Sequence, residues 1–304
     1  MTKYKIILNP IAGKGGAAAL IPEIEATLKS LNLDYDLVVT EEPGHAISLA
    51  KEAAEKKYDV VVSAGGDGTS NEVLNGLMQA KKAGVKNITM GVIPVGRGND
   101  FAFSMGVPID LKASIEAIAK GEKHLLDIGI VYGDKYPEGR YFGNGVGIGF
   151  DAVVGFVAAK MKLTGFMAYL VAALKTIFIY FKAPTIQLDL DDKTITQADL
   201  MVSIMNGRRM GGTFMMAPDS KHDDGVFDLC IAGQVSRLQI FGLIPQFMKG
   251  SQGGHKAVRY EHSRKITATA LEGTLPCHAD GETVCEEGKQ VKIELLPAQI
   301  NLIY

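Results

Sequence analysis

The stretch at residues 65–69, Gly-Gly-Asp-Gly-Thr, constrains the fold more than any other part of this chain. Residues 60–62 before it are consecutive valines without polar alternation, a pattern typical of a strand buried on both faces of a parallel sheet. After the loop, Thr69 and Glu72 form a capping-box pattern, and apolar residues then recur on one helical face. The sequence therefore predicts a strand, a tight loop and a helix, with the loop at the helix N-terminus.

This loop has the composition of a phosphate site. Glycines let backbone N–H groups approach a ligand closely, and a helix N-terminus adds a partial positive charge. Asp67 is unexpected there, because a carboxylate repels phosphate unless a divalent cation lies between them or the carboxylate handles a proton. The pattern thus favours phosphoryl transfer over a plain glycine-rich turn with a capping Asp. The candidate loop residues are Gly65, Gly66, Asp67, Gly68, Thr69, Ser70 and Asn71.

Length and composition limit the number of domains, the class of partner and the compartment. A chain of 304 residues, 47% of them hydrophobic and 22% charged, predicts two folded domains. The formal charge of −2 provides no broad basic surface, which argues against nucleic acid as the main partner. Three scattered cysteines suit neither a disulfide framework nor a zinc site, and the N-terminal residues lack a signal-peptide pattern. We expect a cytoplasmic protein.

The first part of the chain alternates strands and helices. Strands are expected at residues 5–8, 35–39, 60–64 and 88–93, with helices at 17–31 and 46–57. The loop at residues 9–16 contains Gly13 and Lys14 and is not a Walker A motif, so it is either a second phosphate cradle or an ordinary loop. In an open parallel sheet these loops share the carboxyl edge, where ligands bind. Residues 1–126 are therefore predicted to form an α/β domain with an open parallel sheet and Gly-rich loops.

The pattern changes after residue 123. A connecting strand is expected at 125–131 and a glycine-laced strand at 141–150. From residue 184 on, short strand-like runs separated by turn residues predict an antiparallel β-sandwich or barrel, so that residues 127–297 form a second domain. These runs are residues 186–190, 198–205, 225–232, 265–271 and 291–296.

One very apolar helical region, residues 152–182, interrupts the second domain. Lys162, Gly165 and Lys175 break the apolar run, which argues against a helix that spans a bilayer. Two readings stay open: a helix packed on the sheet, or a helix that faces lipid at a membrane surface. Its basic residues suit anionic headgroups or plain solvation, and they are Lys160, Lys162, Lys175 and Lys182.

A turn near the C-terminus holds two candidate general bases. Asp280-Gly281 is a hairpin signal, and Asp280 alone reads as a structural residue there. Transfer of a phosphoryl group to an alcohol also needs a carboxylate that accepts the hydroxyl proton, and both Asp280 and Glu282 fit that role. The choice between them stays open. Cys277 and Cys285 flank this turn and are expected to be free thiols.

Several motifs occur in an order that resembles the bacterial soluble diacylglycerol kinase family, which is kin to the sphingosine and ceramide kinases. The match runs nearly end to end. It includes Asn9-Pro10 with Gly13, the loop at 65–69, Pro94-x-Gly96-x-Gly98-Asn99-Asp100-Phe101, Ala217-Pro218 followed by Asp223-Asp224-Gly225, and His278-Ala279-Asp280-Gly281-Glu282. The resemblance implies an N-terminal nucleotide domain and a C-terminal β-sandwich that binds the lipid. It also implies that residues 298–304 return to the first domain.

The resemblance further implies roles for individual residues. The nucleotide would be contacted by Asn9, Gly13, Lys14, Thr40, the loop from Gly65 to Asn71, and Asn99. Asp67, Asp100 and Asp127 would hold the catalytic Mg²⁺ through water, and Lys221, Asp224 and Val226 would hold a second, structural Mg²⁺. From spacing alone, the Asp223–Gly225 segment reads as a turn between strands. Arg97 departs from the family, which commonly has Thr there, and this Arg either binds phosphate or is solvated.

The resulting hypothesis is a lipid kinase that depends on ATP and Mg²⁺. It would phosphorylate the hydroxyl of diacylglycerol or a related lipid to phosphatidic acid or its analogue, and it would associate peripherally with a membrane surface. The alternatives are a nucleotide kinase resembling NAD kinase and a catalytically silent lipid-binding protein. The sequence leaves open which lipid is the acceptor and whether the chain forms a homodimer.

Overall fold

The computed structural model describes residues 2–161, 163, 166–180 and 182–304. The chain divides into two compact units, Met1–Asp127 together with Ala298–Tyr304, and Ile128–Pro297. Each unit has its own apolar core. We call them the N-terminal unit and the C-terminal unit.

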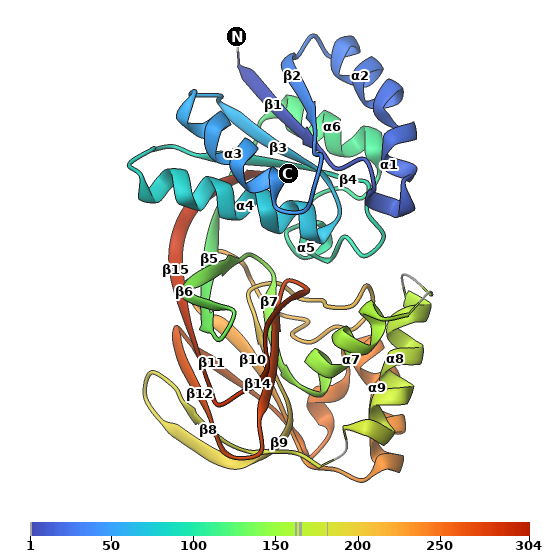
Figure 1. Ribbon diagram of the computed structural model, residues 1–304, viewed down its shortest axis with the longest axis vertical. Helices are drawn as coiled ribbons and strands as arrows, with labels where there is room; N and C mark the ends of the chain where they lie inside the picture. Colours follow the sequence, from blue (N-terminus) through green and yellow to red (C-terminus); the bar gives the residue numbers. More distant parts are fainter. Residues whose placement is uncertain (1, 162, 164–165, 181) are drawn as a thin grey trace. The chain divides into compact units, whose positions relative to one another are not determined.

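The N-terminal unit is a parallel sheet in the order β15, β4, β3, β1, β2, where β15 contributes its last residues (Figure 1). Its strands are β1 (Lys3–Leu8), β2 (Asp34–Val39), β3 (Val60–Gly65), β4 (Thr89–Pro94) and the end of β15 (Gln290–Ile303). Its helices are α1 (Gly16–Ala19), α2 (Ile21–Ser30), α3 (His45–Glu55), α4 (Asp67–Lys82), α5 (Asp100–Ser104) and α6 (Leu111–Lys120), with a 3₁₀ turn η1 (Ala12–Lys14). All six residues of β3 and of β4 are buried, as a sheet covered on both faces requires.

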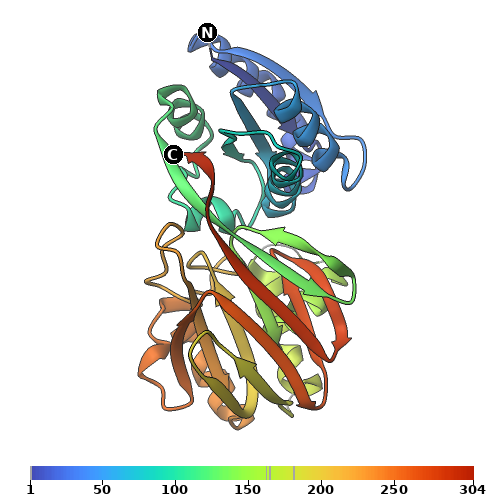
Figure 2. The same ribbon diagram turned by 90° about the vertical axis from the view of Figure 1, so that its left-hand side faces the viewer.

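The strand order of this unit reverses at β1, which pairs in parallel with both β2 and β3. The loops after β1 and β3 therefore leave the sheet at the point where the order switches, the usual ligand position in open α/β sheets. The C-terminal end of the chain adds one more parallel strand, with Asn301 opposite Thr89 and Leu302 opposite Met90 (Figure 2).

The C-terminal unit contains two antiparallel sheets that share the long strand β9 (Thr194–Met205). Residues 194–198 pair with β8, and residues 201–205 pair with β7 and β10. The other strands are β5 (Lys123–Gly133), β6 (Tyr136–Phe142), β7 (Gly145–Gly149), β8 (Thr185–Asp189), β10 (Phe227–Gly233), β11 (Val258–Ser263), β12 (Lys265–Glu272), β13 (Leu275–Ala279), β14 (Glu282–Gly288) and the first part of β15. An apolar core drawn from both sheets lies between them.

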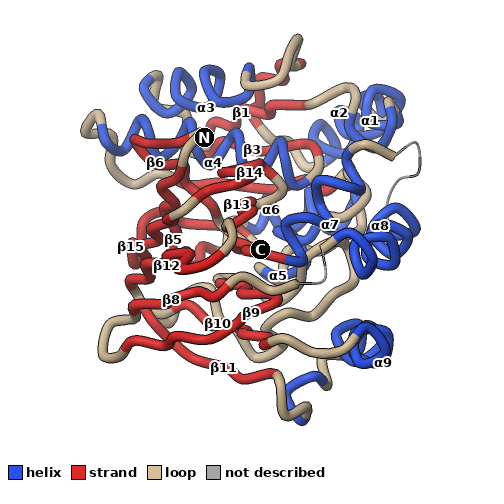
Figure 3. The backbone as a smooth tube through the Cα atoms, turned by 60° about the horizontal axis from the view of Figure 1, so that its bottom comes forward, coloured by secondary structure: helices blue, strands red, loops and turns tan. Residues whose placement is uncertain are grey.

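Helices cover the outer face of the sheet that contains β7, β9 and β10 (Figure 3). They are α7 (Phe150–Ala159), α8 (Phe166–Ile179) and α9 (Arg237–Lys249), and a 3₁₀ turn η2 (Gln252–Gly254) follows α9. The fold class expected from the sequence is confirmed, with a parallel α/β part followed by an antiparallel β part.

Several local expectations differ from the structure. The helix expected at 17–31 is divided at Leu20. The strand expected at 141–150 is divided between the end of β6 and β7, and α7 begins at Phe150. The helical region 152–182 forms parts of two helices, while Lys162, Gly165 and Phe181 lie outside the described residues. Helix α9 and strand β11 were not anticipated.

The capping box predicted for Thr69 and Glu72 is wrong. The cap residue of α4 is Gly66, and no side chain caps this helix. The Glu72 carboxylate instead accepts hydrogen bonds from the backbone N–H groups of Gly44, at 2.8 Å, and Ala46, at 3.2 Å. It therefore satisfies the N-terminus of α3, a neighbour in space that the local sequence pattern could not reveal.

Candidate functional site

The predicted phosphate loop lies at the carboxyl end of β3, and loops from two other strands contact it. The Asn9 side-chain amide after β1 donates a hydrogen bond of 3.1 Å to Thr69 Oγ1. After β4, the backbone N–H groups of Val95 and Gly96 donate to the Gly65 carbonyl at 3.0 and 3.2 Å. The three loops thus form one surface at the edge of the sheet.

Two glycines are required where these loops meet. A Cβ on Gly96 would lie 2.4 Å from the Gly66 Cα, so the two backbones touch without side chains between them. A Cβ on Gly65 would lie 2.3 Å from Thr69 Oγ1. The close approach leaves the loop backbone, rather than bulky side chains, facing any ligand at the helix end.

Asp67 and Asp100 face a common space in this unit. The first oxygen of Asp67, Oδ1, accepts a 2.9 Å hydrogen bond from the backbone N–H of Phe101. A Cβ on Gly98 would lie 2.8 Å from Asp67 Oδ2 and 3.8 Å from Asp100 Oδ2. Two carboxylate oxygens directed at one point are hard ligands of the kind that Mg²⁺ prefers, so this pair fits a hydrated divalent cation.

Asp127, the third predicted member of the acidic set, has a different contact. Its Oδ1 accepts a 2.7 Å hydrogen bond from the backbone N–H of Ala298, where the returning C-terminal segment begins. Ala298 has a positive φ of 52°, so this carboxylate also holds an unusual backbone conformation. Among the described residues, no group of three or more His, Cys, Asp or Glu side chains is arranged to hold a metal.

The remaining predicted nucleotide residues fall into two groups. Lys14 at the end of η1 and Gly68 in the first turn of α4 are exposed, and Arg97 is exposed between Gly96 and Gly98. The others are packed into the structure. Thr40 and Asn99 are buried, and Gly13 lies against the Val95 carbonyl. Ser70 Oγ is 3.0 Å from Ser63 Oγ, and Asn71 accepts hydrogen bonds from the Asn75 side-chain amide.

The two candidate bases, Asp280 and Glu282, have different surroundings in the C-terminal unit. Asp280 lies in the turn between β13 and β14 with a φ of 47°, and its carboxylate accepts three backbone hydrogen bonds. The donors are Gly143 at 2.8 Å, Asn144 at 3.1 Å and Gly145 at 2.9 Å. All three donors are backbone N–H groups, so this carboxylate has a structural role at the turn. Asp280 thus connects the β13–β14 turn to the start of β7.

Glu282 begins β14 and is partly exposed. Within the described part of the chain the Glu282 carboxylate makes no hydrogen bond or ion pair, which leaves both oxygens available to a ligand. Cys277 and Cys285 occupy opposite positions on the same hairpin, and both are free, buried thiols.

The loop predicted to hold a second metal has a turn geometry. Asp224 Oδ1 accepts a hydrogen bond of 3.3 Å from the backbone N–H of Val226. The nearby Asp228 carboxylate lies 2.9 Å from His262 Nε2. The Asp224 contact matches the turn that spacing alone indicated.

A polar cluster that the sequence did not reveal lies on the helix-covered face of the C-terminal unit. Asp151, in the first turn of α7, accepts hydrogen bonds of 2.8 Å from Ser203 Oγ on β9 and from the backbone N–H of Ala152. A Cβ on Gly147 would lie 2.4 Å from Asp151 Oδ2 and 2.5 Å from His278 Nε2, so both side chains occupy the space that this glycine leaves. We call Asp151, Ser203 and His278 the polar cluster.

Loss of hydration shifts the titration of this cluster, although Asp151 and His278 each keep part of their surface exposed. It raises the pKa of Asp151 to about 7. The hydrogen bond from Ser203 lowers this pKa, but by less than the loss of hydration raises it. Burial lowers the pKa of His278 to about 4, and His278 Nδ1 has no hydrogen-bond partner among the described residues. At neutral pH the imidazole is therefore uncharged. The one signal in the sequence was the alternation of glycines at 145, 147 and 149, which clears one face of β7.

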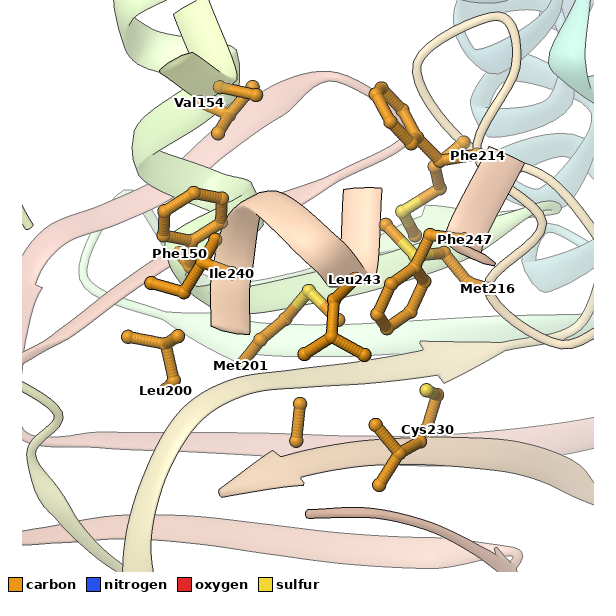
Figure 4. Close-up of a cluster of buried hydrophobic side chains, with 14 of the residues drawn as sticks. Phe150, Val154, Leu200, Met201, Phe214, Met216, Cys230, Ile240, Leu243 and Phe247 are labelled. Atoms are coloured by element: carbon orange, nitrogen blue, oxygen red, sulfur yellow. The ribbon is translucent and has the colours of Figure 1, made fainter. Parts of the chain in front are cut away.

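A methionine-rich apolar layer lies between the helices and the sheet (Figure 4), and it includes Met201 and Met205, which flank Ser203 along β9. In the close-up, Phe150 from α7 is drawn beside Ile240 from α9, and Leu243 from α9 is drawn beside Met201 from β9. Met205, Met210 and Met216 belong to the same layer. Methionine side chains are flexible and polarizable, so this layer is built from side chains that can change their shape.

Comparisons with known proteins agree with this architecture. Residues 3–131 match the model of the diacylglycerol kinase catalytic domain, and residues 144–304 match the YegS C-terminal NAD kinase beta sandwich-like domain. A diacylglycerol kinase from Staphylococcus saprophyticus is 28% identical over 282 residues, which cover 92% of this chain and 88% of that protein. One from Bacillus subtilis is 28% identical over 286 residues, covering 93% and 90%.

Solved structures show the same fold. A crystal structure of a diacylglycerol kinase from Bacillus anthracis superposes with a TM-score of 0.80 at 24% identity, covering 100% of this chain and 97% of that one. Yeast NADH kinase has a TM-score of 0.52 at 9% identity, a likeness of fold alone. The resemblance drawn from the motifs is thus confirmed, and the chain belongs to the diacylglycerol kinase family as a kinase with that catalytic domain and a YegS-type C-terminal domain.

Proposed function

We propose that this kinase transfers the γ-phosphoryl group of ATP to the free hydroxyl of diacylglycerol or a closely related lipid, giving phosphatidic acid or its analogue. The family implies ATP as the donor and a lipid as the acceptor. The observation that carries the choice of acceptor is the methionine-rich layer together with the polar cluster. A layer of this kind suits a molecule with long acyl chains and one polar end, and suits a dinucleotide poorly.

The N-terminal unit supplies the groups for the nucleotide. Backbone N–H groups at the start of α4 and the approach of Gly66 to Gly96 support a phosphate chain at this edge. Asp67 and Asp100 would hold Mg²⁺ through water, and the ion would neutralise charge on the transferred phosphoryl group. We further propose that Asp127 fixes the C-terminal return through its hydrogen bond from Ala298.

The C-terminal unit supplies the base. Glu282 accepts the proton of the lipid hydroxyl while the hydroxyl oxygen forms a bond to the γ-phosphorus and the bond between that phosphorus and the β,γ-bridging oxygen breaks. The products are the phosphorylated lipid and ADP, with the proton on Glu282. Asp280, which accepts three backbone hydrogen bonds, keeps the β13–β14 turn in place.

The lipid is held through its two chemically different parts. Its acyl chains would contact the methionine-rich layer, and its glycerol end would contact Asp151 and Ser203. A lipid of this class is a membrane component, so we also propose that the kinase works at a membrane surface. No helix in the described part of the chain is long and apolar enough to cross a bilayer.

The test is transfer of label from γ-labelled ATP with Mg²⁺ to diacylglycerol, monoacylglycerol or sphingosine in mixed micelles, with NAD in a parallel reaction. We expect label in diacylglycerol, a loss of about 100-fold or more in kcat for Glu282→Gln, and near-normal activity for Glu286→Gln on the same strand. Label on NAD would instead support the nucleotide-kinase alternative. Activity of Glu282→Gln equal to wild type would remove Glu282 from the mechanism.

A further inference from the structure

Helices α8 and α9 carry large apolar side chains on their outer surfaces. Six of the exposed large apolar residues among those described lie on these two helices: Met167, Leu174, Phe178, Ile179, Leu238 and Phe241. Phe178 and Ile179 are each 65% exposed, and Leu238 is 83% exposed. Soluble proteins seldom gather so many on one surface, and such a patch marks an interaction site.

These exposed side chains are distinct from the side chains with which the two helices pack on the core. The inner positions of α8, including Ala172, Ala173 and Ile177, are buried in the methionine-rich layer. On α9 the inner positions Ile240 and Leu243 are buried in the same layer. Both helices therefore satisfy the core with one face and present a second apolar face outward.

The end of α8 and the start of α9 form one continuous surface. The Arg237 Nε–H donates a 3.3 Å hydrogen bond to the carbonyl of Ile177, and the Arg237 guanidinium lies 6.0 Å from the Phe178 ring centroid. Figure 1 and Figure 3 show the two helices side by side along one side of the sheet. We define the α8–α9 face as Leu174, Lys175, Phe178, Ile179, Arg237, Leu238 and Phe241.

The two segments that carry this face contain charged residues of one sign. Residues 152–188, which include α8, contain four lysines and no acidic residue. Residues 229–260, which include α9, contain four basic residues and no acidic residue. Because the whole chain has a formal charge of −2, the absence of acidic residues leaves these two segments with a positive charge that the rest of the chain lacks. Lys175 and Arg237 lie within the face, and Lys182 follows α8, all three exposed.

We propose that the α8–α9 face is the surface with which this protein docks on an anionic lipid bilayer. Phe178, Leu238 and Phe241 insert among the acyl chains near the headgroups, while Lys175, Lys182 and Arg237 contact anionic headgroups. The lipid acceptor would be reached from this surface, a role that rests on the proposed function. Binding to the bilayer itself depends on the exposed apolar residues and the charge and not on the catalytic groups.

The experiment measures binding of the full chain to sedimented vesicles of phosphatidylcholine alone and of phosphatidylcholine mixed with phosphatidylglycerol. We expect binding to the anionic vesicles that weakens as salt rises. Lys175→Glu with Arg237→Glu should lower the affinity about fivefold or more per charge, since each basic residue near an anionic surface contributes on the order of 1 kcal/mol. Phe178→Ser with Phe241→Ser should reduce binding at all salt concentrations.

Matched controls lie elsewhere on the C-terminal unit. Leu271→Ser removes an apolar side chain that is 53% exposed on β12, and Lys292→Glu reverses an exposed charge on β15. Both should bind vesicles as wild type does. Circular dichroism would establish that every variant is folded.

A second assay separates this proposal from the proposed function. Phosphorylation of a short-chain diacylglycerol dissolved as monomers should be unchanged in the face variants, because no bilayer is involved. Wild-type affinity for anionic vesicles in both face variants would overturn the proposal. So would a homodimer that these substitutions dissociate, measured by sedimentation equilibrium, while vesicle binding persists, because the face would then be a subunit interface.

Discussion

The carboxylate of Asp67 accepts a hydrogen bond of 2.9 Å from the backbone N–H of Phe101, which connects the loop after β3 to the first turn of α5. One oxygen of Asp67 therefore has a structural task, while the other lies toward Gly98 and Asp100. The two tasks can be separated by substitution. Asp67→Asn keeps the acceptor for Phe101 and removes the charge, whereas Asp67→Ala removes both.

We expect Asp67→Asn to unfold at nearly the wild-type temperature and to lose most of its kinase activity, because the cation site loses a charged ligand. Asp67→Ala should also lose about 1–3 kcal/mol of unfolding free energy, since the Phe101 N–H loses its acceptor. Urea titration and the labelled-ATP assay measure the two effects. Full activity in Asp67→Asn would contradict the assigned role.

Gly98 tests the geometry of the same pair without changing any charge. An alanine Cβ there would lie 2.8 Å from Asp67 Oδ2, so the carboxylate must move. We expect Gly98→Ala to raise the Mg²⁺ concentration needed for half-maximal activity. Gly155→Ala in α7 is the control, because its Cβ would meet no atom within 4 Å. Equal Mg²⁺ dependence in both variants would argue against the pair as a cation site.

Asp280 and Glu282 should respond to substitution in opposite ways. Asp280→Ala leaves three backbone N–H groups without their acceptor and should lower the free energy of unfolding by about 3 kcal/mol or more. Glu282→Gln should leave stability within about 0.5 kcal/mol of wild type, as expected for a partly exposed position, and should abolish activity. Thermal unfolding and kcat measured on the same preparations would show the division. A stable but inactive Asp280→Asn would instead favour Asp280 as the base.

Asp127 should behave as a structural residue. Asp127→Asn retains an oxygen for the Ala298 N–H, and we expect it to be stable and largely active. Asp127→Ala should loosen residues 298–304, and hydrogen exchange at Asn301 and Leu302 should rise because β15 pairs with β4 there. A large loss of activity in Asp127→Asn at wild-type stability would show that Asp127 belongs to the metal site.

The polar cluster predicts a specific dependence of stability on pH. The pKa of Asp151 is about 7 in the folded protein and about 4 when unfolded, so between these values the folded state binds more protons and stability falls as pH rises. His278 has a folded pKa of about 4 and an unfolded value near 6.5, so its contribution rises with pH over that window. The two contributions oppose each other between pH 4 and 6.5.

Substitution should expose each contribution alone. Relative to wild type, Asp151→Asn should become progressively more stable as pH rises from 4 to 7, by at most about 1.4 kcal/mol per pH unit. His278→Asn should show the opposite trend relative to wild type from pH 4 to 6.5. Urea unfolding at several pH values measures both. A constant difference across the range would show that these groups do not titrate as their burial indicates.

Much of the fold could be predicted because its signals are local. The valines at 60–62 indicated a buried strand, and the glycines after them indicated a tight loop at a helix N-terminus, which is where the structure has β3 and α4. Alternation of strands and helices indicated the parallel sheet, and turn residues between short strands indicated the antiparallel part. In each case the pattern and its cause lie within a few residues of one another.

The roles of the carboxylates were decided by tertiary structure, because a carboxylate acts through the donors it meets. Glu72 caps a helix 26 residues away, Asp280 accepts from backbone groups 135–137 residues away, and Asp127 accepts from a residue 171 positions later. The polar cluster likewise assembles from α7, β9 and β13 on a face cleared by glycine. The sequence by itself determined which residues could bind phosphate, metal or a proton. Only the tertiary structure determined which of these side chains accept hydrogen bonds from distant backbone N–H groups.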